Sequence, residues 1–470
     1  MAGDELTYLP AVELARMIRE RRVSPVEAME AALARIEVVQ PKLNAFCFVY
    51  AEEALTAARA AEQSVTGGAA LGPLHGVPIA IKDFTPTKGK RTTRGSYAFE
   101  HWVPDFDPVI VERLRRAGAI MVGKTATPEF AYSSFTQSPL WGITRNPWDL
   151  ERTPGGSSGG SGAAVASGCV ALAEGTDMGG SVRIPAAFCG LVGLKPSLGR
   201  IPMDIVGTVF DSISHFGPLA RTVADAALFL AVTQGPDDRD IQSLVPGLEV
   251  PVPPPADVRG LRLALSLDLG FYAVDPEVEA NTRAAAEALR AAGAEVEEVE
   301  LNWNHAQVDA WNDYWGVFMA ASFGDVLADH REKMDPNVVA LMERGLALDA
   351  VSFKRIETVR TEQWLGLARV FEDFDALLCP TMTRAAPPVE AQDRDFDRLD
   401  PDGRYHGLDM TSQFNNVPQC PALSVPSGFT EGGLPTALQI VGRRFDDLGV
   451  LRIGAALEAA RPWSARRPPV

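Results

Sequence analysis

The chain has 470 residues, more than one hydrophobic core usually holds, and its 46% hydrophobic and 22% charged residues are typical of a soluble globular protein. Its formal net charge is -17, from 44 Lys and Arg against 61 Asp and Glu. An acidic surface repels phosphate groups, so the charge argues against nucleic acid and anionic membranes as partners. No secretory signal and no apolar run of about 18 residues is visible, so we expect a soluble, cytoplasmic protein.

The cysteines and histidines give no sign of a metal or a disulfide framework. Five cysteines are scattered without a CxxC pair, which favours reduced thiols: Cys47, Cys169, Cys189, Cys379 and Cys420. No histidine and carboxylate cluster has the spacing of metal ligands. We therefore expect no metal and no cofactor.

Residues 1–70 are predicted to form a helical segment. Ser24, Pro25 and Glu27 give a strong start signal, because serine caps, proline suits the first helical position and glutamate completes a capping box. Apolar residues then recur at helical spacing as far as Ile36. A second helix is predicted at residues 51–63.

Residues 71–245 differ, because short apolar runs alternate with helical patterns there. The predicted strands are residues 77–81, 119–122 and 170–173, and the predicted helices are residues 108–117 with Asp107 as the cap, 163–167 and 222–233. A glycine-bearing turn is predicted at residues 175–181.

The remainder of the chain continues this alternation. A proline-rich linker at residues 250–255 is followed by a predicted strand, helix and strand at 261–266, 275–292 and 296–301, then by long helices to residue 371, then by strands at 376–379, 422–425 and 436–441. This order predicts an α/β fold with a central mixed sheet and helices on both faces. Residues 250–370 are interpreted as a variable, substrate-shaping insertion in one large domain that residues 371–470 complete.

Two familiar motifs are rejected. Residues 118–125 match the P-loop letter for letter, but the intervening residues are an apolar strand and no helix follows. Residues 155–159 match the GxSxG nucleophile elbow, but no hydrophobic strand precedes them. Among six histidines only His215 lies in a glycine-rich context, so a Ser-His-Asp triad is disfavoured.

Lys82, at the end of an apolar strand, is a candidate base. Amide hydrolysis needs a nucleophile, a base and donors for the oxyanion. A lysine can serve as the base if burial depresses its pKa. The alternative is a structural lysine that pairs with Asp83.

Residues 154–196 closely resemble the amidase signature, reading PGGSSGGSGAAVASGCVALAEGTDMGGSVRIPAAFCGLVGLKP. Residues 74–83 resemble the lysine-bearing strand of that family, and residues 421–426 and 434–442 resemble its closing strands. The resemblance covers nearly the whole chain and is weakest between residues 250 and 371. It implies that residues 71–245 form the amidase-signature core with the catalytic triad.

The resemblance also implies roles for individual residues. Ser181 matches the nucleophile, Ser157 the bridging serine that follows a cis peptide bond, and Lys82 the base. The backbone amides of Met178, Gly179, Gly180 and Ser181 match the oxyanion hole, and Ser158, Asp177 and Arg183 match positions that support the site. Ser181 is also expected to open a helix, whose N-terminal amides favour negative charge.

The family resemblance implies an amidohydrolase that cleaves linear amides through an acyl-enzyme, with side activity on esters and carbamates. The sequence looks most similar to the hydrolases of nylon oligomers and carbamates and to the aryl amidases. Two alternatives stay open: the amidase-type subunit of a glutamine-dependent amidotransferase, and a non-catalytic scaffold in such a complex. The retained triad argues against a scaffold. We expect a small-molecule amide or carbamate as partner, and a monomer or homodimer.

An aromatic group in the variable region has two interpretations. Trp311, Tyr314, Trp315 and Phe318 have the i, i+3, i+4, i+7 spacing of one helical face. That face either packs into the core or forms an aromatic wall around the substrate.

Overall fold

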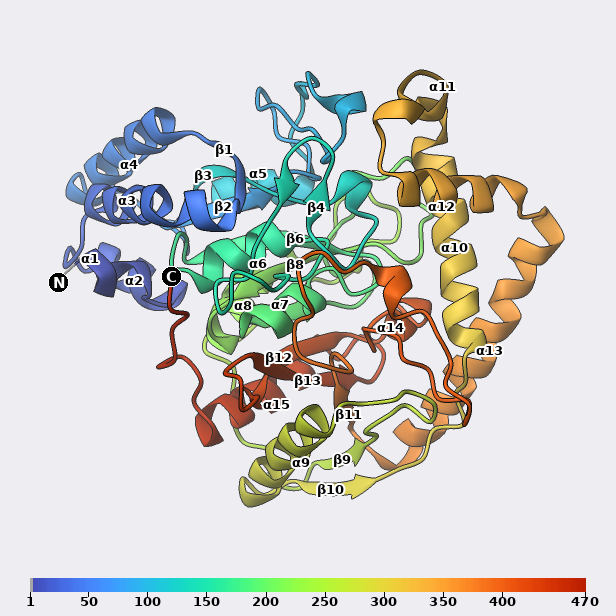
Figure 1. Ribbon diagram of the computed structural model, residues 1–470. Helices are drawn as coiled ribbons and strands as arrows, with labels where there is room; N and C mark the ends of the chain where they lie inside the picture. The colour runs from blue at the N-terminus through green and yellow to red at the C-terminus, as the bar shows by residue number, and fades with distance from the viewer. Residues whose placement is uncertain (1–2) are drawn as a thin grey trace.

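Eleven of the strands join into one mixed sheet, as a computed structural model that describes residues 3–470 shows (Figure 1). The strand order is β1-β3-β2-β6-β8-β7-β12-β13-β11-β9-β10. The strands are β1 (Phe46–Val49), β2 (Pro78–Lys82), β3 (Ile120–Thr125), β6 (Leu172–Asp177), β7 (Val192–Lys195), β8 (His215–Ala220), β9 (Arg262–Leu265), β10 (Glu295–Glu298), β11 (Ala376–Pro380), β12 (Ala422–Phe429) and β13 (Pro435–Gly442), with β4 (Gln137–Ser138) and β5 (Gly142–Ile143) as a separate pair.

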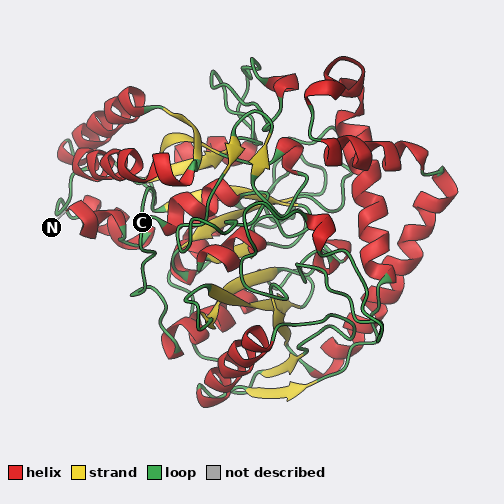
Figure 2. Cartoon of the chain, viewed as in Figure 1, coloured by secondary structure: helices red, strands yellow, loops and turns green. Residues whose placement is uncertain are grey.

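Helices cover both faces of this sheet (Figure 2). One group includes α6 and α7, which contact each other, and α6 also contacts β2 and β6. In a second group, α15 contacts both α8 and α9; α8 contacts β8, and α9 and α15 contact β12 and β13. The α-helices are α1 (Gly3–Thr7), α2 (Ala11–Arg19), α3 (Pro25–Leu43), α4 (Ala51–Thr66), α5 (Val109–Arg116), α6 (Gly159–Ala166), α7 (Arg183–Cys189), α8 (Val223–Thr233), α9 (Pro276–Ala291), α10 (Ala306–Phe323), α11 (Leu327–His330), α12 (Pro336–Ala347), α13 (Ala350–Asp373), α14 (Gln413–Asn416) and α15 (Asp447–Ala460). The predicted α/β architecture is confirmed, whereas the domain boundaries stay predictions.

Strands β2, β3 and β6 position the site. Strand β2 pairs in parallel with β3 along its whole length and with β6 only at its beginning. The other edge of β6 pairs antiparallel with β8 as far as Asp177. Lys82, the candidate base at the end of β2, therefore lies beyond the point where β2 and β6 stop pairing.

The structure confirms the predicted capping box and corrects two other local predictions. The capping box at Ser24 is present. Asp107 does not cap α5, because its carboxylate instead accepts the Lys88 amide and pairs with Arg115. The predicted turn at residues 175–181 begins only after Asp177, since residues 175–177 continue the ladder with β8.

The rejected P-loop is a strand in the structure. Residues 120–125 form β3, and Lys124 is fully buried, with its ammonium bonded to the Thr85 carbonyl and to the hydroxyls of Thr87 and Thr92. The lysine of this motif is thus enclosed by the chain's own oxygens.

Residues 306–373 form a helical arm beside the sheet, coloured yellow to orange in Figure 1. Its helix α10 packs against both α12 and α13. Within the described residues, no helix combines the length and apolar character that crossing a membrane requires.

Candidate active site

Lys82 ends strand β2 and bonds to two hydroxyl groups. Its Nζ donates to Ser157 Oγ at 2.6 Å and to Thr176 Oγ1 at 2.9 Å, and all three side chains are buried. Burial lowers the pKa of Lys82 to about 7, although the charges of Glu174 and Asp177 oppose the shift. A substantial share of this amine is therefore neutral near pH 7.

Asp83 is not the partner of this lysine. Its carboxylate accepts the amide and the hydroxyl of Thr93 instead. The structural alternative of a Lys82–Asp83 pair is therefore wrong. The charges that oppose the shift of the Lys82 pKa come from Glu174 and Asp177.

Ser157 lies in the tight loop before α6. The peptide bond between Gly156 and Ser157 is cis, as the resemblance implies. Glycine is required at position 156 because a Cβ there would lie 2.5 Å from the Ser133 carbonyl oxygen. The backbone of residues 133–135 thus packs directly against the Ser157 loop.

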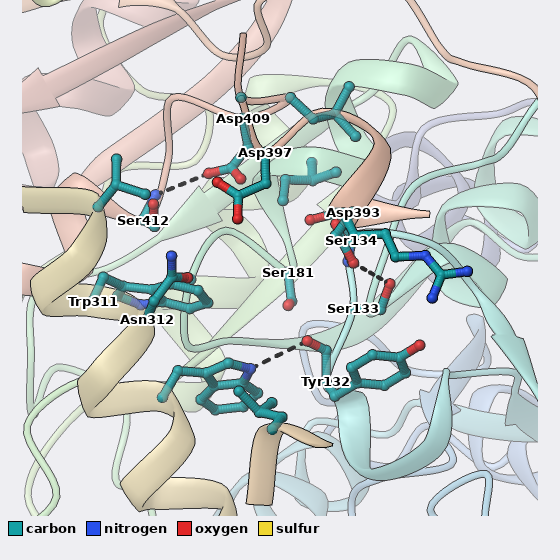
Figure 3. Close-up of a pocket in the computed structure, with 18 of the residues that line it drawn as sticks. Tyr132, Ser133, Ser134, Ser181, Trp311, Asn312, Asp393, Asp397, Asp409 and Ser412 are labelled. Atoms are coloured by element: carbon teal, nitrogen blue, oxygen red, sulfur yellow. Dashed lines mark hydrogen bonds between the residues drawn. The ribbon is translucent and has the colours of Figure 1, made fainter. Parts of the chain in front are cut away.

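Ser181 lies on the wall of a cavity of about 260 Å³ and points into it (Figure 3). It precedes α7 by two residues, so the expectation that it opens this helix is corrected. The Ser158 amide donates to the Ser181 carbonyl at 3.2 Å and joins the two serine loops. Among residues 3–470 the Lys82–Ser157 bond is present, whereas a bond between the Ser157 and Ser181 hydroxyls is not, so that last step of the relay stays a prediction.

A buried ion pair fixes the loop before Ser181. Arg183 donates to both oxygens of Asp177, at 2.8 and 2.9 Å, and both side chains are fully buried. Burial alone would raise the pKa of Asp177, but Arg183 holds it well below its ordinary value. The guanidinium also bonds to Thr411, Gln439 and Asn415.

The structure divides the amides predicted as oxyanion donors. The Gly180 amide donates to Asp177 at 2.9 Å, so its predicted role is contradicted. The amides of Met178, Gly179 and Ser181 have no bonded acceptor within residues 3–470. Of these three, the N–H groups of Gly179 and Ser181 lie nearer the nucleophile along the chain than that of Met178 and are the better candidates for an oxyanion hole.

Trp311 holds this loop from the helical arm. Its Nε1 donates to the Met178 carbonyl at 3.3 Å. A Cβ on Gly179 would lie 2.3 Å from the indole, so only glycine fits beneath the ring. The arm therefore contacts the predicted oxyanion loop directly.

Only half of the predicted aromatic wall lines the cavity. Trp311 and Trp315 do, and their rings stack with centroids 5.7 Å apart. Tyr314 instead lies near Ser212 and packs against Phe353. Phe318 stacks on the ring of Trp315 and does not line the cavity. The role proposed for Tyr314 and Phe318 is corrected, because a face that packs against two helices cannot turn four side chains to one cavity.

Several groups at the site have no role in the sequence-based prediction. Thr176 bonds to the Lys82 ammonium, and alternation along β6, which puts Thr176 on the same face as Glu174, could have pointed to it. The cavity also carries polar side chains from distant segments: Ser133, Asn312, Asn337, Asp393, Arg394, Asp397 and Asp409.

His215 is excluded as the base. It is buried, its Nδ1 lies 2.9 Å from the Ile213 carbonyl, and burial together with the Lys195 charge lowers its pKa to about 3. In the described part of the chain, no group of three His, Cys, Asp or Glu is arranged to hold a metal ion, and independence from metal stays a prediction.

The fold and this Lys-Ser-Ser arrangement define an amide-hydrolysing class of enzyme, and the sequence places the chain in it. Residues 27–451 match the family described as Amidase, so the chain belongs to the amidase, or amidase signature, family. It is a hydrolase of that family that acts on carbon–nitrogen bonds.

Similar proteins differ in their described activities. The chain is 38% identical to an acylamidase of Rhodococcus erythropolis, over 100% of this chain and 98% of that protein. It is 37% identical to one subunit of the glutamyl-tRNA(Gln) amidotransferase of Chloroflexus aggregans, over 99% of each. Among solved structures, a bacterial aryl acylamidase matches with a TM-score of 0.91 and 30% identity over 97% of each chain. A 6-aminohexanoate cyclic dimer hydrolase matches with a TM-score of 0.85 and 31% identity, over 98% of this chain and 99% of that one.

Proposed function

We propose that the protein is an amidohydrolase that cleaves linear amides through an acyl-enzyme on Ser181. The observation that carries the proposal is the bond from the buried, partly neutral Lys82 to Ser157, beside a cavity that Ser181 lines. A weakly acidic hydroxyl needs such a base to become a nucleophile near neutral pH.

In this mechanism the neutral Lys82 accepts the Ser157 proton while Ser157 accepts the proton of Ser181. The Ser181 oxygen attacks the amide carbon, and the amides of Gly179 and Ser181 stabilise the oxyanion. The proton returns along the same path to the leaving nitrogen as the C–N bond breaks. Water then repeats the attack on the ester and releases the acid and Ser181.

We propose aryl amides as the preferred substrates. The stacked indoles of Trp311 and Trp315 offer a flat apolar surface for an aromatic ring, and the names of the acylamidase and aryl acylamidase relatives support this choice. Esters and carbamates pass through the same tetrahedral geometry and are proposed as side substrates. A preference for nylon oligomers has only the cyclic dimer hydrolase in its support.

The test is a panel of an acyl anilide, an aliphatic amide, a dipeptide amide, an aryl carbamate and an aryl ester, assayed with the native enzyme and Ser181→Ala. We expect the highest kcat/KM among the amides for the anilide, and no turnover above background in the variant. An enzyme that cleaves none of the amides, yet turns over the ester, would contradict the amidohydrolase proposal.

A role as the amidase-type subunit of a glutamine-dependent amidotransferase is a second candidate, which the charges of the cavity favour. Arg394, Asp397 and Asp409 line it, and they offer partners for the carboxylate and the ammonium of a free amino acid such as glutamine. Ammonia release from glutamine with a kcat/KM above that for the anilide would select this function. A non-catalytic scaffold would not react with a fluorophosphonate at Ser181.

A further inference from the structure

The fully buried Glu174 has no role in the mechanism so far. It lies on β6, next to the strand that ends with Lys82. A carboxylate is among the groups that proteins least often bury completely, because its charge loses the solvation of water. Its position one strand away from the proposed base therefore needs a physical reason.

Glu174 occupies the gap where β2 and β6 separate. The two strands pair at Ile79 with Leu172 and at Ala80 with Ala173, and the pairing then ends. Beyond that point Glu174 Oε2 accepts the backbone N–H of Lys82 at 2.9 Å. The Glu174 carboxylate thus replaces the backbone acceptor that a further residue pair of the ladder would supply to Lys82. The end of β2 therefore stays apart from the backbone of β6.

Two side chains on the same face of β6 bind Lys82, one at its backbone and one at its ammonium. Glu174 and Thr176 are two residues apart, so their side chains project to the same side of the strand. Thr176 accepts the ammonium of Lys82 at 2.9 Å, while Glu174 binds its backbone. Glu174 Oε1 also accepts the Thr85 hydroxyl at 2.8 Å, so both carboxylate oxygens are acceptors, as in the ionised form.

Lys82 lies among several charged or titratable groups. Glu174 and Asp177 on β6 act on Lys82 directly, and Asp83 follows it in the chain; Lys124 on β3 acts on Glu174, and Arg183 on α7 and His215 on β8 act on Asp177. Asp83 is engaged with Thr93, and Asp177 with Arg183. Lys124 donates to the Thr85 carbonyl and to the hydroxyls of Thr87 and Thr92. Glu174 alone among these acids bonds to Lys82 itself.

We propose that Glu174 is a positioning residue for the base: its carboxylate anchors the Lys82 backbone and supplies the negative charge that keeps the lysine basic enough to accept a proton. The inference rests on the proposed role of Lys82. Burial lowers the pKa of that amine and the Glu174 charge raises it, while burial raises the pKa of Glu174 itself. Without this charge the amine would be neutral at lower pH but would be a weaker base.

The test is the pH profile of kcat/KM for Glu174→Gln. Glutamine has the same size, can still accept the Lys82 amide and can donate to the Thr85 oxygen, so it removes mainly the charge. We expect the ascending limb to move to lower pH by about one unit, and the plateau to fall severalfold. An unmoved limb with native activity would overturn the proposal.

The matched control is Glu458→Gln. Glu458 is also largely buried and accepts a backbone amide, that of Val223, on the remote helix α15. Its neutral variant should leave the ascending limb in place. A limb that moves equally in both variants would show a general effect of buried carboxylates and overturn a specific role for Glu174.

Two further variants separate the possible failures. Lys82→Ala tests the base itself: if it keeps the native ascending limb, the proposed mechanism fails, whereas an unmoved limb in Glu174→Gln alone sinks only this inference. If Glu174→Gln does not fold, Glu174→Asp decides. Aspartate keeps the charge but shortens the reach to the Lys82 amide, so we expect lower kcat with the limb within about half a unit of its native position. A limb shifted to acid despite the retained charge would contradict the proposal.

Discussion

The buried triad region and the helical arm differ in how their side chains are held. Around Lys82, the side chains of Ser157, Glu174 and Thr176 are fully buried, and each bonds to Lys82. The arm, residues 306–373, is rich in aromatic side chains and meets the site through the indoles of Trp311 and Trp315. The difference separates two tasks: the core holds the groups that move protons, and the arm shapes the space for the substrate.

The two regions meet at the loop of residues 178–181. The core fixes that loop from one side through the Asp177–Arg183 pair, and the arm fixes it from the other through the Trp311 indole. A substitution in the core should therefore change the chemistry, and a substitution in the arm should change binding, except at Trp311. The following experiments test that division.

Ser181→Ala should have the largest effect. Loss of a nucleophile that works as a unit with its base lowers kcat by up to the order of 10⁶-fold, so turnover of an anilide should fall to background. Ser158→Ala is the matched control, because the Ser158 hydroxyl donates only to the Thr176 carbonyl, at 3.3 Å. Fluorophosphonate labelling followed by mass spectrometry gives the result. Label that persists in Ser181→Ala would place the nucleophile elsewhere.

Lys82→Ala should come next, with a loss of about 10²–10⁴-fold in kcat/KM and a flattened pH profile. A lysine accepts a proton only when it is neutral, so activity should rise as the pH passes through its pKa of about 7. Lys82→Arg should not restore activity, because guanidinium stays charged in this range. Amides should lose more than esters, because the amine leaving group needs the relayed proton.

Lys195→Met provides the control for burial. Burial also lowers the pKa of Lys195 to about 7, but its Nζ donates only to the carbonyls of Pro196, Pro418 and Cys420. Its loss leaves buried carbonyls without a donor and should cost about 1–3 kcal/mol of stability, with the ascending limb unchanged. If Lys195→Met also flattened the profile, the assignment of the limb to Lys82 would fail.

The same division explains what could be predicted from the sequence. Ser24 and Glu27 form a capping box within four consecutive residues, and residues 154–196 carry a continuous glycine-rich motif. Both features could therefore be predicted from local sequence. Glu174 was not, because its function depends on β2 and β6 separating after two residue pairs. Such a register follows from the packing of distant segments.

The arm shows the same limit in a helix. Periodicity correctly grouped the aromatic residues of α10, but it could not decide which of them face the cavity. That choice depends on α12 and α13, which cover other sides of α10. Asp107 failed as a cap for a related reason, since Lys88 and Arg115 compete for its carboxylate.

Trp311→Phe should have an intermediate effect, and it tests the exception in the arm. Phenylalanine keeps a ring against Gly179 but removes the N–H that holds the Met178 carbonyl. We expect kcat to fall about tenfold or more with a smaller change in KM, because misplacing an oxyanion donor costs chemistry. Trp315→Phe is the matched control: its indole donates to the Tyr132 carbonyl at 3.2 Å, away from the oxyanion loop, so KM should change more than kcat. Equal effects on kcat in both variants would contradict a special role for Trp311.

Tyr314→Phe should have the smallest effect, because this side chain faces away from the cavity. The substitution removes one contact, between the Tyr314 hydroxyl and Ser212 Oγ at 3.3 Å, and Arg360 still donates to that Ser212 oxygen at 3.1 Å. The ring keeps its packing against Phe353. The free energy of unfolding should therefore fall by less than about 1 kcal/mol, as measured by denaturant titration. With no contact to the substrate to lose, kcat and KM for the anilide should stay within about twofold of the native values. If KM instead rose tenfold while stability held, Tyr314 would belong to the substrate wall, and the boundary between the wall and the packing face of α10 would have to be redrawn.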